Sequence, residues 1–393
     1  DAPRASRAAP RFRAAQDAAT LAAFHPGMLV SALLVVLGAL LAHALPPRTR
    51  RARNPPDPPS FKAMRARLTV TPERYHQIAT VALVLLTTIV FTGAAVRVTG
   101  SGLGCPTWPK CSQTGLYNPS GIHGIIEFSN RLFTFPVSLA AFAAAFFAFL
   151  RSPRRADLCV LGVLLPLGVV SQAVLGGLTV LYDLRPGFVM GHYGLSILII
   201  VAAWALFWRS KPGYEDGLIE PGARDRLTMW AARLLLPLGA LTVLAGTAAS
   251  AAGPHGGGKG THDLIKRLYV KGPDTLDWAV TNHGTVAAVL GVATLIALAI
   301  AYVRDANGQL LLALSTVAVM LALQGGLGII QYSLKLPTGL VWTHVVMATL
   351  TWVALLWVWS AAGTPAAAGA PAAEPTVASA SPPRASAATP SRS

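Results

Sequence analysis

The sequence predicts an all-α polytopic membrane protein, with eight core transmembrane helices arranged as two duplicated four-helix bundles. Three observations lead to this prediction. Only 12% of the 393 residues are charged and 53% are hydrophobic, with a mean hydropathy of +0.53, whereas soluble domains carry about 25% charged residues. Eight apolar runs are long enough to cross a bilayer, and the second four repeat features of the first four. The length therefore divides into spans and not into globular domains.

Each apolar run holds about 20 or more mostly apolar residues, enough for a hydrocarbon core of about 30 Å. The runs fall at residues 76–97, 122–150, 157–181, 187–208, 228–252, 278–303, 308–333 and 338–360. The predicted units are an N-terminal extension, an N-terminal bundle, a C-terminal bundle and a tail, at residues 1–75, 76–208, 228–360 and 363–393.

The basic residues of the loops are divided unequally between the two sides. Sixteen Lys and Arg residues lie in the stretches 46–75, 151–155, 209–226 and 304–307, and the loops of the opposite side hold eight. The positive-inside rule makes the richer side cytoplasmic, the C-terminus included, and places the loop after the first span on the outer face. Loop charge thus accounts for the net charge of +16, and we expect no nucleic-acid partner.

The two ends of the chain are predicted from composition. Residues 28–45, "MLVSALLVVLGALLAHAL", are nearly long enough to span. They indicate an extra N-terminal helix, an extension upstream of a start at Met64, or an uncleaved signal-like segment. The tail contains mainly Ala, Pro, Ser and Thr, which predicts a disordered cytoplasmic segment.

An internal repeat relates the two bundles. Residues 172–192 align without a gap with 324–344, and 90–100 resemble 243–253. His192 and His344 match, each twenty residues after a matched glutamine. Since two spans separate equivalent helices, the halves share one orientation, with a pseudo-twofold axis along the membrane normal.

The repeat brings histidines to equivalent helices. His283 and His344 lie on the second and fourth helices of the second half, where facing imidazoles have the bis-axial geometry of a low-spin heme. The alternative is that each only hydrogen-bonds a neighbouring helix. In the first half His192 is retained, Asn130 aligns with His283, and His123 lies seven residues earlier, about 10 Å further out. Small residues that leave room for a macrocycle, or for close helix packing, are Gly284, Gly291, Gly325, Gly326 and Gly328.

Glu127 is an ionisable residue one turn inside a predicted membrane helix. Such a carboxylate must be paired, protonated or facing a polar cavity. His123 lies at i−4 and Arg131 at i+4. The pattern indicates either a structural His–Glu–Arg ladder or a proton-handling group beside a substrate, with Arg131 and Arg97 meeting anionic groups such as propionates.

Five segments in this order resemble the heme A synthase family, integral-membrane enzymes that convert heme O to heme A for cytochrome oxidase. They are "AAVRVTGSGLGCPTWPKC", "HGIIEFSNR", "GHYGLSI", "TNHG" and "WTHVVMA". The resemblance covers about residues 72–360 and implies an eight-helix fold of two four-helix bundles. It implies heme b between His283 and His344, and a heme O site in the N-terminal half with Glu127, Phe128, Arg131 and His192.

The sequence departs from the family pattern at two places. Asn130 stands where many members have histidine, so either His123 takes part in binding the substrate heme or His192 is its only axial ligand. The outer loop at 253–277 lacks the second cysteine pair of many members.

Three cysteines are present, and two of them share the outer loop. Cys105 and Cys111 would lie in an oxidising compartment, where neighbouring thiols normally close a disulfide. The pair is either a staple that shapes the loop over the substrate site or a redox-sensitive pair that affects heme entry. Cys159, inside the third span, has no evident partner.

The resemblance implies an enzyme of the bacterial plasma membrane that oxidises one methyl of heme O to a formyl group through successive hydroxylations. Glu127 would handle protons beside His123 and Arg131, and heme b would relay electrons. The implied partners are the lipid bilayer, a heme O synthase that delivers the substrate, and an electron donor that the sequence does not identify; a homo-oligomer is left open. Two alternatives are a diheme b-type electron carrier and a transporter built from parallel repeats.

Overall fold

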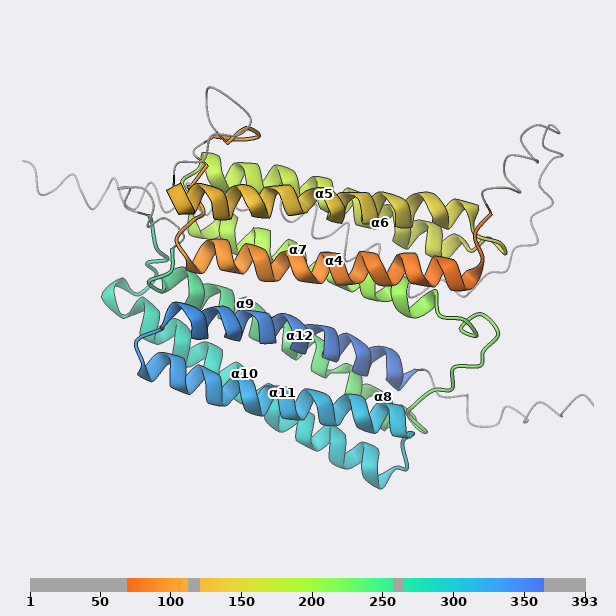
Figure 1. Ribbon diagram of the computed structural model, residues 1–393. Coiled ribbons are helices and arrows are strands. Elements are labelled where there is room, and N and C mark those ends of the chain that lie inside the picture. The colour runs from red at the N-terminus through yellow and green to blue at the C-terminus, as the bar shows by residue number, and fades with distance from the viewer. Residues whose placement is uncertain (1–68, 106, 112–120, 257–264, 364–393) are drawn as a thin grey trace, which may run out of the picture.

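The computed structural model describes residues 69–105, 107–111, 121–256 and 265–363 (Figure 1). The predictions for residues 28–45 and for the tail beyond residue 363 lie outside this part of the chain. The helices of the first half are α4 (Pro72–Val98), α5 (Gly121–Leu150), α6 (Ala156–Leu181) and α7 (Pro186–Arg209). Those of the second half are α8 (Arg226–Arg233), α9 (Leu235–Ala252), the 3-10 turn η1 (Gly272–Asp274), α10 (Thr275–Val303), α11 (Gly308–Ser333) and α12 (Thr338–Ala362).

The prediction of eight core transmembrane helices is confirmed. Eight helical segments are long and apolar enough to cross a membrane, with α8 and α9 together forming the fifth. Extended pairing within the described ranges is limited to one isolated bridge between Val70 and Arg151, so the protein is all-α there. The protein is thus a multi-pass membrane protein.

The fifth span differs from its prediction because it is two helices. α8 ends at Arg233 and α9 begins at Leu235. Pro237 has no N–H to bond the carbonyl of Arg233, which interrupts the helical ladder at this point. Pro136 and Pro166, in contrast, lie inside the continuous helices α5 and α6.

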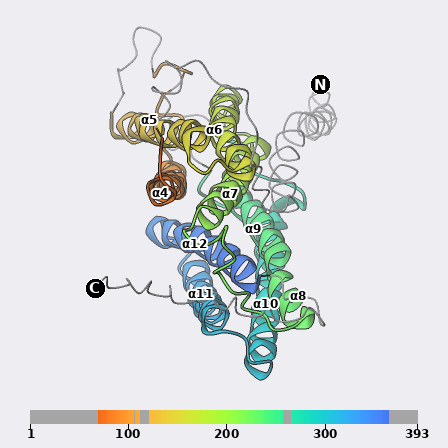
Figure 2. The same cartoon turned by 90° about the vertical axis from the view of Figure 1, so that its right-hand side faces the viewer.

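The first and fourth helices of each half form the main interface between the halves. In the first half each helix packs on the next and α7 returns to α4, and in the second half α12 returns in the same way to α9. Across the interface α4 packs on α12, α7 on α9, and α7 on α12 (Figures 1 and 2). The second and third helices, α5 with α6 and α10 with α11, lie further out. The neighbour pattern is the same in both halves; the duplication itself stays a prediction from the sequence.

Polar side chains join α7 to α12 within this apolar interface. Tyr193 Oη lies 3.4 Å from Thr349 Oγ1, and Trp204 Nε1 donates to Ser360 Oγ at 2.9 Å. Trp352 Nε1 donates to a backbone carbonyl of α7 at 3.2 Å. Because buried donors away from water need partners, these bonds fix the register of the two helices.

Buried ion pairs close the first half at the end opposite residues 99–111. Asp157 Oδ2 accepts from Arg155 Nη2 at 2.6 Å and from Arg209 Nη1 at 3.2 Å, and Arg151 Nη2 donates to Glu215 Oε1 at 3.0 Å. These arginines are among those that predict the cytoplasmic side. Their charges are paired, as burial requires.

Candidate functional site

Two histidines of the second half face each other between helices. His283 lies on α10 and His344 on α12. Their ring centres are 6.2 Å apart and the ring planes are inclined by 76°. Both residues lie near the N-terminal ends of their helices. These ends are on the same side of the protein as residues 99–111, and we call this side the loop end.

Contacts with α9 fix the His283 ring. Its Nδ1 lies 3.1 Å from the carbonyl oxygen of Thr242. A carbonyl can only accept, so Nδ1 carries the proton and Nε2 keeps a lone pair free for a metal, the usual arrangement of a ligating histidine. Gly246 of α9 allows this approach, because a Cβ at that position would lie 3.0 Å from His283 Cε1.

His344 is held against α11 in a comparable way. A Cβ at Gly328 would lie 3.6 Å from His344 Cε1, and Gln324 Nε2 donates to the His344 carbonyl at 3.3 Å. His344 Nδ1 is buried, and within the described chain it has no hydrogen-bond partner.

The pair fits an iron porphyrin. Metal–imidazole bonds are about 2 Å long, so two imidazoles on opposite sides of one iron have ring centres roughly 6 Å apart, as observed here. A porphyrin supplies four nitrogens itself, which makes two protein ligands sufficient. In the described ranges no three His, Cys, Asp or Glu residues are grouped to hold a bare metal ion. Within the described structure no neighbouring side chain or helix lies within 4 Å of a Cβ built at Gly284, Gly291, Gly325 or Gly326, so the space beside these positions is open.

The first half repeats one side of this arrangement. His192 lies on α7 against Gly176 of α6, where a Cβ would be 3.1 Å from His192 Cε1. Gln172 Nε2 donates to the His192 carbonyl at 2.9 Å, as Gln324 does for His344. His192 Nδ1 is buried and without a partner among the described residues.

On the other side of the first half, Asn130 takes the position that His283 has in the second. It extends from α5, and its Oδ1 accepts from Thr92 Oγ1 of α4 at 2.7 Å. The repeat did not indicate that Thr92 is the partner of Asn130. Thr92 aligns with Ala245, which has no polar side chain.

His123 is engaged by the turn that follows α4. Its Nδ1 lies 2.9 Å from Ser101 Oγ, and Ser101 in turn lies 2.8 Å from Thr99 Oγ1. The described structure contains no His123–Glu127 hydrogen bond, so the upper rung of the predicted His–Glu–Arg ladder is not formed. Whether His123 contacts a substrate heme stays a prediction.

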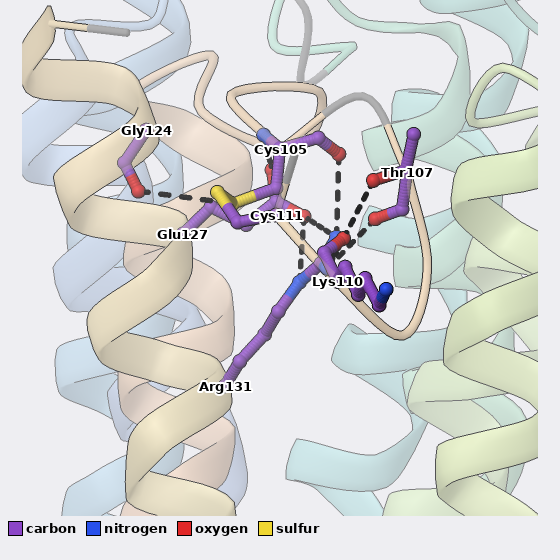
Figure 3. The surroundings of a disulfide bond; sticks show 7 residues. All are labelled: Cys105, Thr107, Lys110, Cys111, Gly124, Glu127 and Arg131. Carbon is purple, nitrogen blue, oxygen red and sulfur yellow. Dashed lines mark hydrogen bonds and ion pairs between the residues drawn. A yellow bond between two sulfur atoms is a disulfide. The ribbon is translucent and has the colours of Figure 1, made fainter. Parts of the chain in front are cut away.

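Glu127 and Arg131 connect α5 to the loop after α4 (Figure 3). Glu127 Oε2 accepts from the Cys105 backbone N–H at 2.8 Å, and its Oε1 accepts from Arg131 Nη2 at 2.5 Å. Arg131 also donates to the carbonyls of Cys105, Thr107 and Lys110, at 3.3, 2.9 and 3.3 Å. The Glu127 side chain is 6% exposed. These bonds clamp the loop onto the first three turns of α5.

The same loop contains a disulfide and reaches α6. Cys105 and Cys111 are joined by an S–S bond of 2.06 Å, which confirms the predicted pairing, and Cys159 is a buried free cysteine. Trp108 packs on Gly177, where a Cβ would come within 2.7 Å of the indole. Gly177 follows the glycine that supports His192, so the loop lies over the loop end of the first half. The paired glycines of "LGGL" are the one sequence signal that could have indicated this contact.

Arg97 connects the halves. Its Nη2 donates to the Ser250 carbonyl at the end of α9 at 3.0 Å, and its buried Nε has no partner among the described residues. A role for Arg97 toward propionates stays a prediction.

Fold and site together define a class: an all-helical, multi-pass membrane protein that carries histidines between helices at positions suited to metalloporphyrin ligation. The model of the COX15-CtaA family, described as cytochrome oxidase assembly proteins, matches residues 76–121 and 120–356. The chain belongs to this family.

Curated relatives carry the name heme A synthase. The protein from Lysinibacillus sphaericus is 30% identical over 129 residues, which are 33% of this chain and 41% of the relative. That from Geobacillus kaustophilus is 33% identical over 120 residues, 30% of this chain and 37% of the relative. The Listeria welshimeri protein is 27% identical over 155 residues, 38% of this chain and 50% of the relative. The chain thus matches half or less of the length of each.

Proposed function

We propose that this protein is a heme A synthase, which oxidises a methyl group of heme O to the formyl group of heme A for cytochrome oxidase. The observation that carries the proposal is the inequality of the two halves. The second half has two facing histidines, whereas the first has His192 on α7 and, at the repeat position of His283, Asn130 on α5. A difference of this kind agrees with one half holding a resident cofactor and the other a reacting substrate, and the curated relatives are named heme A synthase.

In this proposal His283 and His344 hold heme b, and His192 holds heme O. Heme b, when bound, supplies one-electron transfer. Because the Thr242 carbonyl accepts from His283 Nδ1–H, Nε2 keeps the lone pair that would bind the iron. Gly246 and Gly328 let α9 and α11 approach these rings closely.

Glu127 is the proposed proton-handling group of the substrate half. It lies on α5 three residues before Asn130, and its carboxylate is held by Arg131 and by the Cys105 N–H. Arg131 keeps the carboxylate oriented and lowers the cost of its charge inside the bilayer. A proton taken up at Glu127 Oε1 would release Arg131 from that oxygen, so proton uptake and loop position are coupled.

The two alternatives have less support. A diheme b-type electron carrier requires two complete ligand pairs, and Asn130 replaces one ligand. A parallel-repeat transporter requires discontinuous helices around a midplane site. The break at Leu234 lies eight residues into the fifth span, and Pro136 and Pro166 leave their helices continuous.

The test is the pigment content of the full-length protein made in cells that also make heme O. We expect bound b-type heme in the purified protein and heme A in the extracted hemes of the membranes. Protein without a Soret band would overturn the proposal, and so would cells that retain heme O without forming heme A. Partnership with a heme O synthase and a membrane electron donor, at the bacterial plasma membrane, belongs to the same proposal.

A further inference from the structure

The two halves hold their candidate ligands with the same set of helices. In the second half α9 positions His283 of α10, and Gly328 of α11 supports His344 of α12. In the first half α4 holds Asn130 of α5, and Gly176 of α6 supports His192 of α7. The residue on the second helix and the residue on the fourth are therefore placed alike in both halves.

The space beside Asn130 differs from the space beside His283. Gly246 of α9 lies against the His283 ring, since a Cβ built at Gly246 would be 3.0 Å from His283 Cε1. Its counterpart in the repeat is Gly93 of α4. No atom of the described chain lies within 4 Å of a Cβ built at Gly93. The shorter asparagine thus leaves open the volume that an imidazole fills in the second half.

Asn130 also presents hydrogen-bond donors. Its Oδ1 accepts from Thr92 Oγ1 at 2.7 Å, which turns the amide nitrogen away from Thr92. An amide nitrogen carries two N–H donors, and within the described residues none of the hydrogen bonds uses them. Donors without partners in a membrane interior are costly, so a bound acceptor would stabilise this arrangement.

We propose that the Asn130 side of the first half is a binding site for a neutral diatomic ligand of heme iron, dioxygen in the cell and carbon monoxide as its probe. The inference rests on the proposed function, because His192 must hold a heme on the opposite side. The ligand would occupy the space beside Gly93 and accept a hydrogen bond from Asn130 Nδ2. Donors and open space on the side opposite the axial histidine decide whether heme iron binds such ligands. The second half, with both axial positions taken by histidine, would bind none.

The experiment uses the full-length protein purified with its hemes, reduced with dithionite and exposed to carbon monoxide. We expect a carbon monoxide difference spectrum from the heme of the first half alone. Asn130→His should keep the heme content and reduce carbon monoxide binding at least tenfold, because a second imidazole occupies the site. The converse variant, His283→Asn, should add carbon monoxide binding in the second half. Asn282→His, at an exposed position of α10, is the matched control and should change neither the heme content nor carbon monoxide binding.

The infrared C–O stretch of the bound ligand tests the hydrogen bond. Asn130→Leu should keep carbon monoxide binding but raise the stretching frequency, because the N–H dipole beside the ligand oxygen is lost. Heme in the first half that binds no carbon monoxide would overturn the inference and leave the proposed function standing, as would full binding by Asn130→His. An unchanged stretch in Asn130→Leu would overturn the role of the amide. Protein that binds no heme would overturn the proposed function, and the inference with it.

Discussion

Glu127→Gln separates the two roles that the structure allows for this carboxylate, a clamp on the loop and a proton-handling group. The glutamine oxygen can still accept from the Cys105 N–H, and the side chain keeps its size. The NH2 group of the glutamine then takes the place of Oε1, and because arginine can only donate, the bonds to Arg131 are lost. Hydrogen bonds to charged groups contribute about 1.5–3 kcal/mol, so the clamp loses about that much free energy. Arg131, 20% exposed, is then left without its counterion.

Two measurements on this variant distinguish the roles. Hydrogen exchange of the loop amides should accelerate by a factor of about 10–150, the equivalent of that loss. Heme A formation, followed by chromatography of extracted hemes, should fall by about 100-fold or more, the usual contribution of a positioned acid–base group. The heme content should stay near that of the parent.

The matched control is Glu215→Gln. Glu215 also pairs with a buried arginine, Arg151, at 3.0 Å, but at the opposite end of the first half. The Glu215→Gln variant should lose a similar amount of local stability but form heme A at the normal rate. Normal heme A formation by Glu127→Gln would refute the proton-handling role and leave the clamp.

Three further results are expected. Replacing either His283 or His344 with alanine should remove one axial ligand and lower retention of b-type heme; an unchanged low-spin b spectrum in both variants would contradict the assignment. Alkylation followed by intact-mass analysis should find Cys105 and Cys111 blocked without reductant, and two free thiols there would be inconsistent with the disulfide. Gly177→Ala places a methyl within 2.7 Å of the Trp108 ring, so the ring must move. Such overpacking costs about 1–3 kcal/mol and should accelerate hydrogen exchange of the loop. Unchanged exchange would contradict the packing of Trp108 on Gly177.

Much of the fold could be predicted because each span must satisfy a bilayer by itself. About 20 apolar residues are required whatever the neighbours are, so hydropathy alone locates the eight segments. The break in the fifth span could not be predicted in the same way. Pro136 and Pro166 leave their helices continuous and Pro237 does not, and this difference depends on how neighbouring helices compensate for the missing bond.

The facing of His283 and His344 was predictable because the repeat placed them on alternate helices of one bundle. The partner of His123 was not. Spacing along a helix indicated Glu127, four residues away, but Ser101 reaches His123 from the turn after α4. Helical periodicity contains no information about how a loop folds back. The contacts of Arg131 with three loop carbonyls could not be predicted from the sequence for the same reason.

The arrangement of the interface has a consequence for how the two halves can diverge. α7 carries His192 and α12 carries His344, and the two helices contact each other. A substitution that changes the packing surface of either helix therefore alters the packing of both halves. Asn130 lies on α5, whose main contacts are with α4 and α6 of its own half. Evolution could therefore alter that position in one half without loss of fit in the other. A duplicated protein of this design is free to specialise on its outer helices, while its shared inner helices stay constrained.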